Sequence, residues 1–198
     1  MRFSQLNMER IMPVMHIVPQ RFVDARGWFS ETWNEAKFHK LGVKAAFCQD
    51  NQSVSVKKAT IRGIHFQRAP HLQSKLVRCL KGRIFDVAVD LRRESPTYKQ
   101  WAGVELSADQ GNQLFVPAGF GHAFLTLEDD CHVAYKVDTY YAPHSDGGIR
   151  WDDPELAIDW PMVGTAPVLS DKDAAMPFLT DSQFEFPYDG NPLVPLSN

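Results

Sequence analysis

Hydrophobic and polar residues alternate through the middle of the chain. In residues 84–91 (IFDVAVDL), every second side chain is a large hydrophobe, and the positions between them include Asp86 and Asp90. This period of two predicts a half-buried β-strand. Similar patterns predict further strands at 75–80, 113–116, 122–127 and 132–137, with a short hairpin turn at 81–83.

One segment carries a helical pattern instead. In residues 34–42 (NEAKFHKLG), Phe38 and Leu41 share one face, Asn34 suits the N-cap and Gly42 suits the C-terminal end. A short helix among many short strands, with turn residues between them, is typical of an all-β sandwich or barrel. We therefore predict an all-β protein with a few short helices.

The 198 residues fit one domain. We predict a barrel core at about residues 45–143, followed by C-terminal loops and short helices at 144–198. Trp151 and Trp160 in the second part need burial, so we expect it to pack on the barrel. A content of 44% hydrophobic and 23% charged residues is ordinary for a globular chain, which at this length folds without disulfides or a metal.

Charge and cysteine content narrow the classes of partner. The net charge of -3 provides no basic field, which argues against nucleic acid. The three cysteines form no CxxC pair, as in a reduced, cytoplasmic protein. Residues 1–20 contain no continuous apolar stretch typical of a secretory signal, and the longest uncharged stretch, from Gly111 to Glu128, is too short and broken to cross a membrane.

None of the seven histidines has the spacing of a metal site. HxH and HExxH are both absent, so we predict no catalytic metal. GxGxxG and the P-loop are absent as well, so we predict no cofactor bound by a glycine-rich loop.

Two residues could carry acid–base chemistry inside a barrel. In residues 61–67 (IRGIHFQ), alternation places His65 on the same face as Gly63, which would leave open space for a ligand, and places Arg62 on the other face. Tyr135 alternates with valines and is expected to point into the barrel. Taken singly, both are more simply core residues, and Asp173, Arg26, Glu31, Arg62 and Lys75 are more simply surface charges.

Seven segments together carry a resemblance to a known family. They are DARGWFSE (24–31), FCQDNQS (47–53), IRGIHFQ (61–67), residues 73–124, residues 127–143, residues 147–161 and LSDKD (169–173), in order over about three-quarters of the chain. The chain resembles the dTDP-4-dehydrorhamnose 3,5-epimerases, the metal-free cupins of dTDP-L-rhamnose biosynthesis. The resemblance implies a cupin-type jelly-roll β-barrel, no cofactor, a dTDP-sugar substrate and a homodimer whose sites borrow residues from the partner chain.

The resemblance also implies roles for particular residues. His65 matches the catalytic base, Asp173 the carboxylate that supports it, and Tyr135 the general acid on the opposite face of the sugar. Lys75 matches the lysine near the 4-keto oxygen, and His122 a second histidine at the substrate. Positions that match substrate-binding residues are Arg26, Phe29, Glu31, Gln49, Asn51, Arg62, Tyr141, Asp146 and Lys172, with Tyr141 stacking on thymine and with Arg26 and Glu31 expected to act across the dimer interface.

These residue types suit the implied reaction. Inverting a carbon next to a ketone removes its proton and returns one to the other face through an enolate, which requires a base, an acid and a partner for the enolate oxygen. We therefore expect dTDP-4-dehydro-6-deoxy-D-glucose to be inverted at carbons 3 and 5 to dTDP-4-dehydro-L-rhamnose.

Three alternatives stay open at this point. One is an epimerase that inverts only carbon 3 or carbon 5 in another deoxysugar pathway. A second is a non-catalytic cupin that binds a nucleotide sugar, although such a protein needs no acid–base pair. The third is a metal-dependent cupin dioxygenase, which the missing HxH disfavours.

Overall fold

The computed structural model describes residues 8–9, 14–162, 164 and 166–193. Much of the segment 1–20, which we interpret as lacking a secretory signal, lies outside these residues. Helices within the described ranges are α1 (Glu35–Leu41), α2 (Asp171–Ala174) and the 3₁₀ turn η1 (Leu179–Asp181). None of these helices is long and apolar enough to cross a bilayer.

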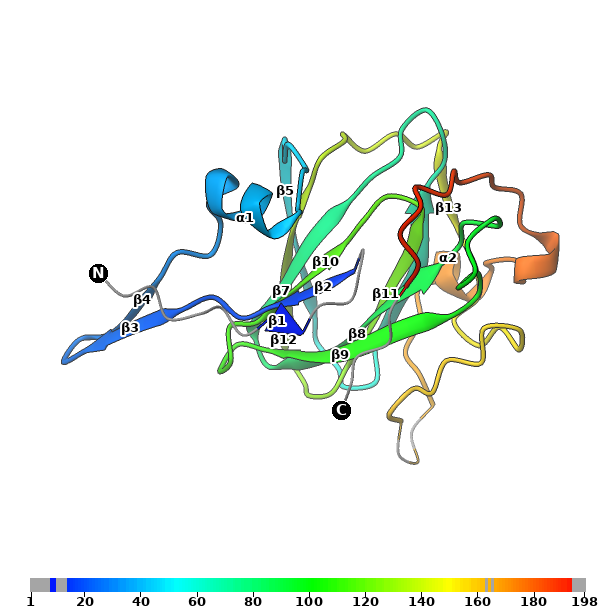
Figure 1. Cartoon of the computed structure of the whole chain (residues 1–198). Coiled ribbons are helices and arrows are strands. Elements are labelled where there is room, and N and C mark those ends of the chain that lie inside the picture. The colour runs from blue at the N-terminus through cyan, green and yellow to red at the C-terminus, as the bar shows by residue number, and fades with distance from the viewer. Residues whose placement is uncertain (1–7, 10–13, 163, 165, 194–198) are drawn as a thin grey trace.

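Two antiparallel sheets face each other and enclose the main core (Figure 1). One sheet has the order β1 (Met8–Glu9), β2 (Met15–Ile17), β10 (Gln113–Val116), β7 (Lys75–Lys81), β12 (Cys131–Val137) and β5 (Gln49–Ser55). The other has the order β13 (Asp146–Gly148), β6 (Ile61–Gln67), β11 (Phe120–Thr126), β8 (Arg83–Asp90) and β9 (Trp101–Ser107). This jelly-roll barrel confirms the predicted fold class.

A separate hairpin, β3 (Arg21–Asp24) and β4 (Gly27–Ser30), extends away from the two sheets (Figure 1). The helix α1 follows it and has the predicted ends. The Asn34 side chain accepts the Lys37 backbone N–H at 3.1 Å, and Gly42 ends the helix with a left-handed φ of 102°. Phe38 of this helix packs on the outer face of the six-stranded sheet.

The prediction that the strand at 84–91 is half-buried is wrong, because both of its faces are buried. Asp86 and Asp90 are fully buried and face the barrel interior. The opposite, hydrophobic face is covered by the C-terminal part of the chain, including Phe184 and Phe186. The sheet is thus packed on both sides, and a carboxylate on its inner face lies in the interior of the barrel.

A bulge in β6 changes which of its residues share a face. The register of β6 against β11 shifts between the pair His65–His122 and the pair Arg62–Phe124, so two residues of β6 lie opposite one residue of β11. Cross-strand partners share a face, and His122 and Phe124 both point to the interior. Arg62 and His65 therefore lie on the same face, and the prediction that they lie on opposite faces is wrong.

The bulge also fills the space that we expected beside His65. A Cβ on Gly63 would lie 2.5 Å from the carbonyl oxygen of His122 and 2.8 Å from the Cα of Ala123. Gly63 also has a φ of 119°, which side chains rarely adopt. Glycine is needed here for the close approach of two backbones, and the expected open space for a ligand is absent at this position.

Candidate active site

A cavity of about 320 Å³ opens between the two sheets. His65 lines it from β6 in the five-stranded sheet, and Tyr135 and Lys75 line it from β12 and β7 in the six-stranded sheet. A base candidate and an acid candidate therefore lie on facing walls. The other residues that line the cavity are Gln49, Asn51, Phe66, Gln67, Gln73, Tyr141, Asp146 and Lys172.

His65 is held by a carboxylate from the far end of the chain. Its Nε2 donates to Oδ1 of Asp173 at 2.5 Å, across 108 residues of sequence. Burial raises the pKa of Asp173, but the hydrogen bond and the charge of His65 outweigh this effect and hold that pKa below its usual range. With Nε2 engaged, Nδ1 is the ring nitrogen of His65 that is left to accept a proton.

Helix α2 places this carboxylate. Ser170 is its N-cap: the Ser170 hydroxyl accepts the backbone N–H of Asp173 at 3.1 Å and donates to Asp173 Oδ2 at 2.9 Å. Both oxygens of Asp173 are therefore engaged, one by Ser170 and one by His65. Asp173 is only 4% exposed, so the solvated turn that its position alone suggests is not formed.

Lys75 is a cationic group of the cavity, which Lys172 also lines. Burial lowers the pKa of its ammonium to about 8, although the charges of Asp86 and Asp146 oppose this shift. At neutral pH the side chain still carries its proton and can donate to an oxyanion.

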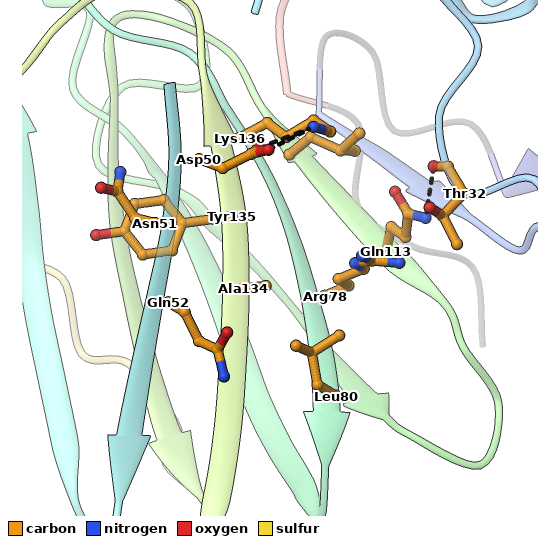
Figure 2. Close-up of a pocket in the computed structure, with 11 residues that line it drawn as sticks. Thr32, Asp50, Asn51, Gln52, Arg78, Leu80, Gln113, Ala134, Tyr135 and Lys136 are labelled. Atoms are coloured by element: carbon orange, nitrogen blue, oxygen red, sulfur yellow. Dashed lines mark hydrogen bonds and ion pairs between the residues drawn. The ribbon is translucent and has the colours of Figure 1, made fainter. Parts of the chain in front are cut away.

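Tyr135 has the properties of a proton donor. Burial raises the pKa of its phenol, against the charge of Arg62, so the phenol keeps its proton at neutral pH. Its cross-strand partner on β5 is Asn51, and Figure 2 shows the two side chains together. The next residue, Lys136, points to the outer face of the sheet, where it pairs with Asp50 (Figure 2). That outer face borders a second cavity, of about 330 Å³.

His122 lies directly across from His65 in the sheet. Its Nε2 donates to Oδ1 of Asp86 at 2.9 Å, and its side chain is 8% exposed. Burial lowers the pKa of His122, with Asp86 acting in the opposite direction. The structure thus holds two histidine–aspartate pairs, whose histidines lie on the adjacent strands β6 and β11.

Polar groups gather at the mouth of the cavity. The Tyr141 hydroxyl donates to Asp146 Oδ2 at 3.2 Å, and Lys172 forms an ion pair with the same oxygen. The Gln49 side chain donates to Asn51 at 2.8 Å and accepts the Tyr141 backbone N–H at 3.3 Å. Because Tyr141 is 56% exposed, its ring remains free for stacking.

Arg62 lies on the other side of the His65–Asp173 pair. It lines a cavity of about 390 Å³ together with Ser170 and Asp173, and its Nε donates to Ser55 Oγ at 3.1 Å. The structure therefore brings Arg62 near the carboxylate that supports His65.

Three predicted site residues lie away from this cavity within one chain. Arg26 and Phe29 belong to the projecting hairpin, where Arg26 pairs with Asp24. Glu31 follows the hairpin and pairs with Lys37 of α1. A single chain therefore does not bring these residues to His65.

Sequence reasoning missed Asp86 and Ser170. Asp86 stood in the polar row of an alternating strand, and the half-buried interpretation placed that row in solvent. Ser170 stands three residues before Asp173, the spacing of an N-cap to the third helical residue, which is a signal present in the sequence.

The arrangement supplies the parts of a proton-transfer site. A histidine oriented by a carboxylate, a protonated tyrosine on the facing wall and a lysine between charged neighbours suit formation of an enolate next to a ketone. Among the described residues, no three or more His, Cys, Asp or Glu side chains form a group that could hold a metal ion.

Comparisons with known proteins agree with this chemistry. The family model described as dTDP-4-dehydrorhamnose 3,5-epimerase matches residues 9–181. The dTDP-4-dehydrorhamnose 3,5-epimerase of Sinorhizobium fredii is 47% identical over 178 residues, which cover 90% of this chain and 91% of the relative.

Two solved structures are similar over almost the whole chain. The dTDP-4-dehydrorhamnose 3,5-epimerase of Bacillus anthracis, with TDP and PPi bound, has a TM-score of 0.84 and 47% identity, covering 88% of this chain and 99% of that one. The dTDP-6-deoxy-D-glucose-3,5-epimerase of Legionella pneumophila, in complex with dTDP-4-keto-L-rhamnose, has a TM-score of 0.85 and 41% identity, covering 90% and 95%.

Proposed function

The chain belongs to the dTDP-4-dehydrorhamnose 3,5-epimerase family, and from this premise we propose that it inverts carbons 3 and 5 of dTDP-4-dehydro-6-deoxy-D-glucose. The product is dTDP-4-dehydro-L-rhamnose, the 4-keto precursor of dTDP-L-rhamnose. The observation that carries the proposal is the placement of His65, with its carboxylate, and Tyr135 on facing walls of one cavity that Lys75 also lines.

Each proton transfer has a residue positioned for it. Nδ1 of His65 removes the proton next to the ketone, and Asp173 stabilises the imidazolium that forms. The ammonium of Lys75 stabilises the enolate oxygen, a contact worth about 3 kcal/mol in comparable sites. Tyr135 then returns a proton to the opposite face of the sugar, which inverts the carbon.

The nucleotide occupies the mouth of the cavity in this proposal. Tyr141 stacks on the thymine, and Arg62 and Lys172 bind phosphate oxygens. Gln49, Asn51 and Asp146 provide further polar contacts to the substrate. Support comes from the cavity, which all of these residues except Arg62 line, and from the ligands named for the Bacillus anthracis and Legionella pneumophila enzymes. Arg62 lines the neighbouring cavity with Asp173.

We propose a homodimer that completes each site with the partner's hairpin. An isolated two-stranded hairpin is marginally stable by itself. This one exposes four large hydrophobic side chains, with Val23 80% and Phe29 69% exposed, as expected of a surface that is covered in an assembly. In a dimer the hairpin and the residue that follows it would bring Arg26, Phe29 and Glu31 of one protomer to the cavity of the other. The other two of the four exposed hydrophobic side chains of the hairpin are Phe22 and Trp28.

We also propose that the enzyme is a cytoplasmic, single-domain protein. All three cysteines are free, as is usual in a reducing compartment. The C-terminal part of the chain shares a core with the five-stranded sheet, which supports one domain.

Deuterium exchange tests the function directly. The purified protein is incubated in heavy water with dTDP-4-dehydro-6-deoxy-D-glucose, and deuterium at carbons 3 and 5 is followed by NMR. Exchange at both carbons, with the L-rhamno configuration confirmed after coupling to a reductase, supports the proposal. Exchange at one carbon would identify a single-site epimerase, and binding without exchange would identify a nucleotide-sugar-binding protein.

A further inference from the structure

The second histidine–aspartate pair, Asp86–His122, has no part in the proton transfers described above. Asp86 is fully buried, and of its two oxygens only Oδ1 has a hydrogen-bond partner among the described residues. That partner is Nε2 of His122 at 2.9 Å. Nothing else competes for this carboxylate by hydrogen bonding in the part of the chain that the structure describes, so its contact with His122 is well defined.

This contact decides which ring nitrogen of His122 carries the hydrogen. A carboxylate oxygen accepts hydrogen bonds, so Nε2 must be the donor. Burial lowers the pKa of His122, which keeps the imidazole neutral with a single N–H. Nδ1 is then a lone pair that can accept a hydrogen bond and cannot donate one.

The neighbours of His122 indicate which group of the substrate could donate a hydrogen bond to its Nδ1. His122 lies directly across the sheet from His65, which takes the proton from the carbon next to the ketone. Lys75 lies close enough for its charge to act on Asp86 and His122, and an ammonium donates only. The ketone oxygen suits the donor Lys75, and the group that suits the acceptor His122 is a hydroxyl on the reacting carbon. In a 4-keto-6-deoxyhexose, carbon 3 carries that hydroxyl and carbon 5 does not.

We infer that Asp86 is a positioning residue that holds His122 as a hydrogen-bond acceptor for the hydroxyl on carbon 3 of the sugar. The inference rests on the proposed function and adds a determinant of substrate choice to it. The site distinguishes a sugar that offers a donor at carbon 3 from one that does not, because a site built to bind a hydroxyl disfavours analogues that lack it.

The tautomer of His122 can be measured in the unmodified protein. Nitrogen-15 NMR of protein labelled in its histidine side chains distinguishes an Nε2–H ring from an Nδ1–H ring, and a His122→Gln variant assigns the signal. We expect Nε2–H at neutral pH. A ring with Nδ1–H, or a doubly protonated ring, would overturn the inference whether or not the protein is an epimerase.

The variant Asp86→Asn tests the role of the carboxylate. An amide has one donor and one acceptor, and the nearby ammonium of Lys75 favours the amide oxygen, which turns the NH₂ group toward His122. We expect the His122 hydrogen to move to Nδ1 and the KM to rise about 10- to 100-fold. The matched control is Asp90→Asn, which alters a buried carboxylate on the same strand that binds Arg92, Ser95 and Thr97 instead. A lowered stability without a change of the His122 tautomer is expected there.

Substrate analogues separate this role from a general structural one. We compare the 3-deoxy and 2-deoxy forms of the 4-keto substrate, using the dissociation constant and deuterium exchange at carbon 5. The 3-deoxy analogue should bind the unmodified enzyme about 10- to 100-fold more weakly than the substrate, and this penalty should largely disappear in Asp86→Asn. The 2-deoxy analogue should be affected equally in both enzymes. An equal 3-deoxy penalty in both enzymes, or loss of exchange at one carbon without any change in binding, would contradict the inference.

Discussion

At the scale of single residues, exposure separates the two histidines of the barrel interior. The side chain of His65 is 29% exposed and borders the cavity, whereas that of His122 is 8% exposed. Each donates Nε2–H to a buried aspartate. Similar pairs can therefore differ in role, one positioned to exchange protons with a substrate and the other to remain neutral.

Two substitutions separate the two proton-transfer residues. We expect His65→Ala to abolish deuterium exchange at both carbons, with a loss of turnover of about 10²–10⁴-fold, because no other base replaces it. Tyr135→Phe should retain exchange but impair inversion, since the proton then fails to return to the opposite face. The measurement is NMR in heavy water. Full activity of either variant would refute the role proposed for that residue.

The lowered pKa of Lys75 predicts that activity is lost at alkaline pH. Its pKa is lowered to about 8, so the ammonium loses its proton as the pH rises through that value, whereas a free lysine stays charged. The charged form stabilises the enolate, and kcat should fall above about pH 8. In Lys75→Arg the guanidinium keeps its charge, so any remaining activity should lack this fall. A profile of the unmodified enzyme that stays flat well above this pH would contradict the role of Lys75.

The alternation of hydrophobic and polar residues does not show which residues far apart in sequence contact each other. Alternation indicated that Tyr135 points inward, and it packs against the interior cluster. Asp173, however, is 108 residues from His65, and only the family resemblance connected the two. A local pattern reports which side of a strand a residue occupies, but the tertiary fold decides which residue lies opposite.

At the scale of elements, strands with regular alternation were predicted well and irregular ones were not. The strands β7, β8, β10, β11 and β12 lie at the predicted positions to within about two residues. The hairpin β3–β4 lacks a buried face, and β13 is three residues long with two glycines, so neither carries the pattern. The bulge in β6 was missed because a register shift leaves no mark in the residue types beyond a single glycine.

The tight packing around Gly63 in β6 leads to a prediction about stability. Gly63→Ala should lower the free energy of unfolding by at least about 2 kcal/mol, because the new Cβ meets the backbone of β11 at a strained φ. Activity should fall as well, since Gly63 lies two residues before His65. Urea denaturation measures the first effect.

The matched control is Gly190→Ala, where φ is also positive but nothing lies within 4 Å of the new Cβ. We expect a cost of about 1–2 kcal/mol there, from backbone strain alone. Equal destabilisation of the two variants would mean that the close approach of β6 and β11 is unimportant.

At the scale of the whole molecule, contacts within a single chain do not explain the position of the hairpin β3–β4. It extends from the barrel with its hydrophobic residues exposed, and it carries two predicted substrate-binding residues (Figure 1). Sequence patterns could not have predicted where it docks, because in the proposed dimer the surface that covers it belongs to another copy of the chain. The family resemblance supplied that expectation.

Mixed dimers test whether sites are shared between protomers. Arg26→Ala impairs the hairpin of its own chain, and His65→Ala impairs the barrel. If sites combine one barrel with the partner's hairpin, a mixed dimer contains one intact site. We expect such dimers, co-expressed with two tags and purified through both, to regain about half of the wild-type activity. Activity no higher than that of the two parent variants would show that each chain builds its site alone.

The position of Asp173 after all the described strands of the two sheets has a consequence for synthesis. Every described strand of both sheets has been translated once Gly148 is added. At that stage Nε2 of His65 still has no carboxylate, and the outer face of the five-stranded sheet still lacks its cover, because both come from residues that follow. A nascent chain therefore lacks the complete base until Asp173 has been added, so fragments released by a ribosome before that point contain the strands of both sheets without it.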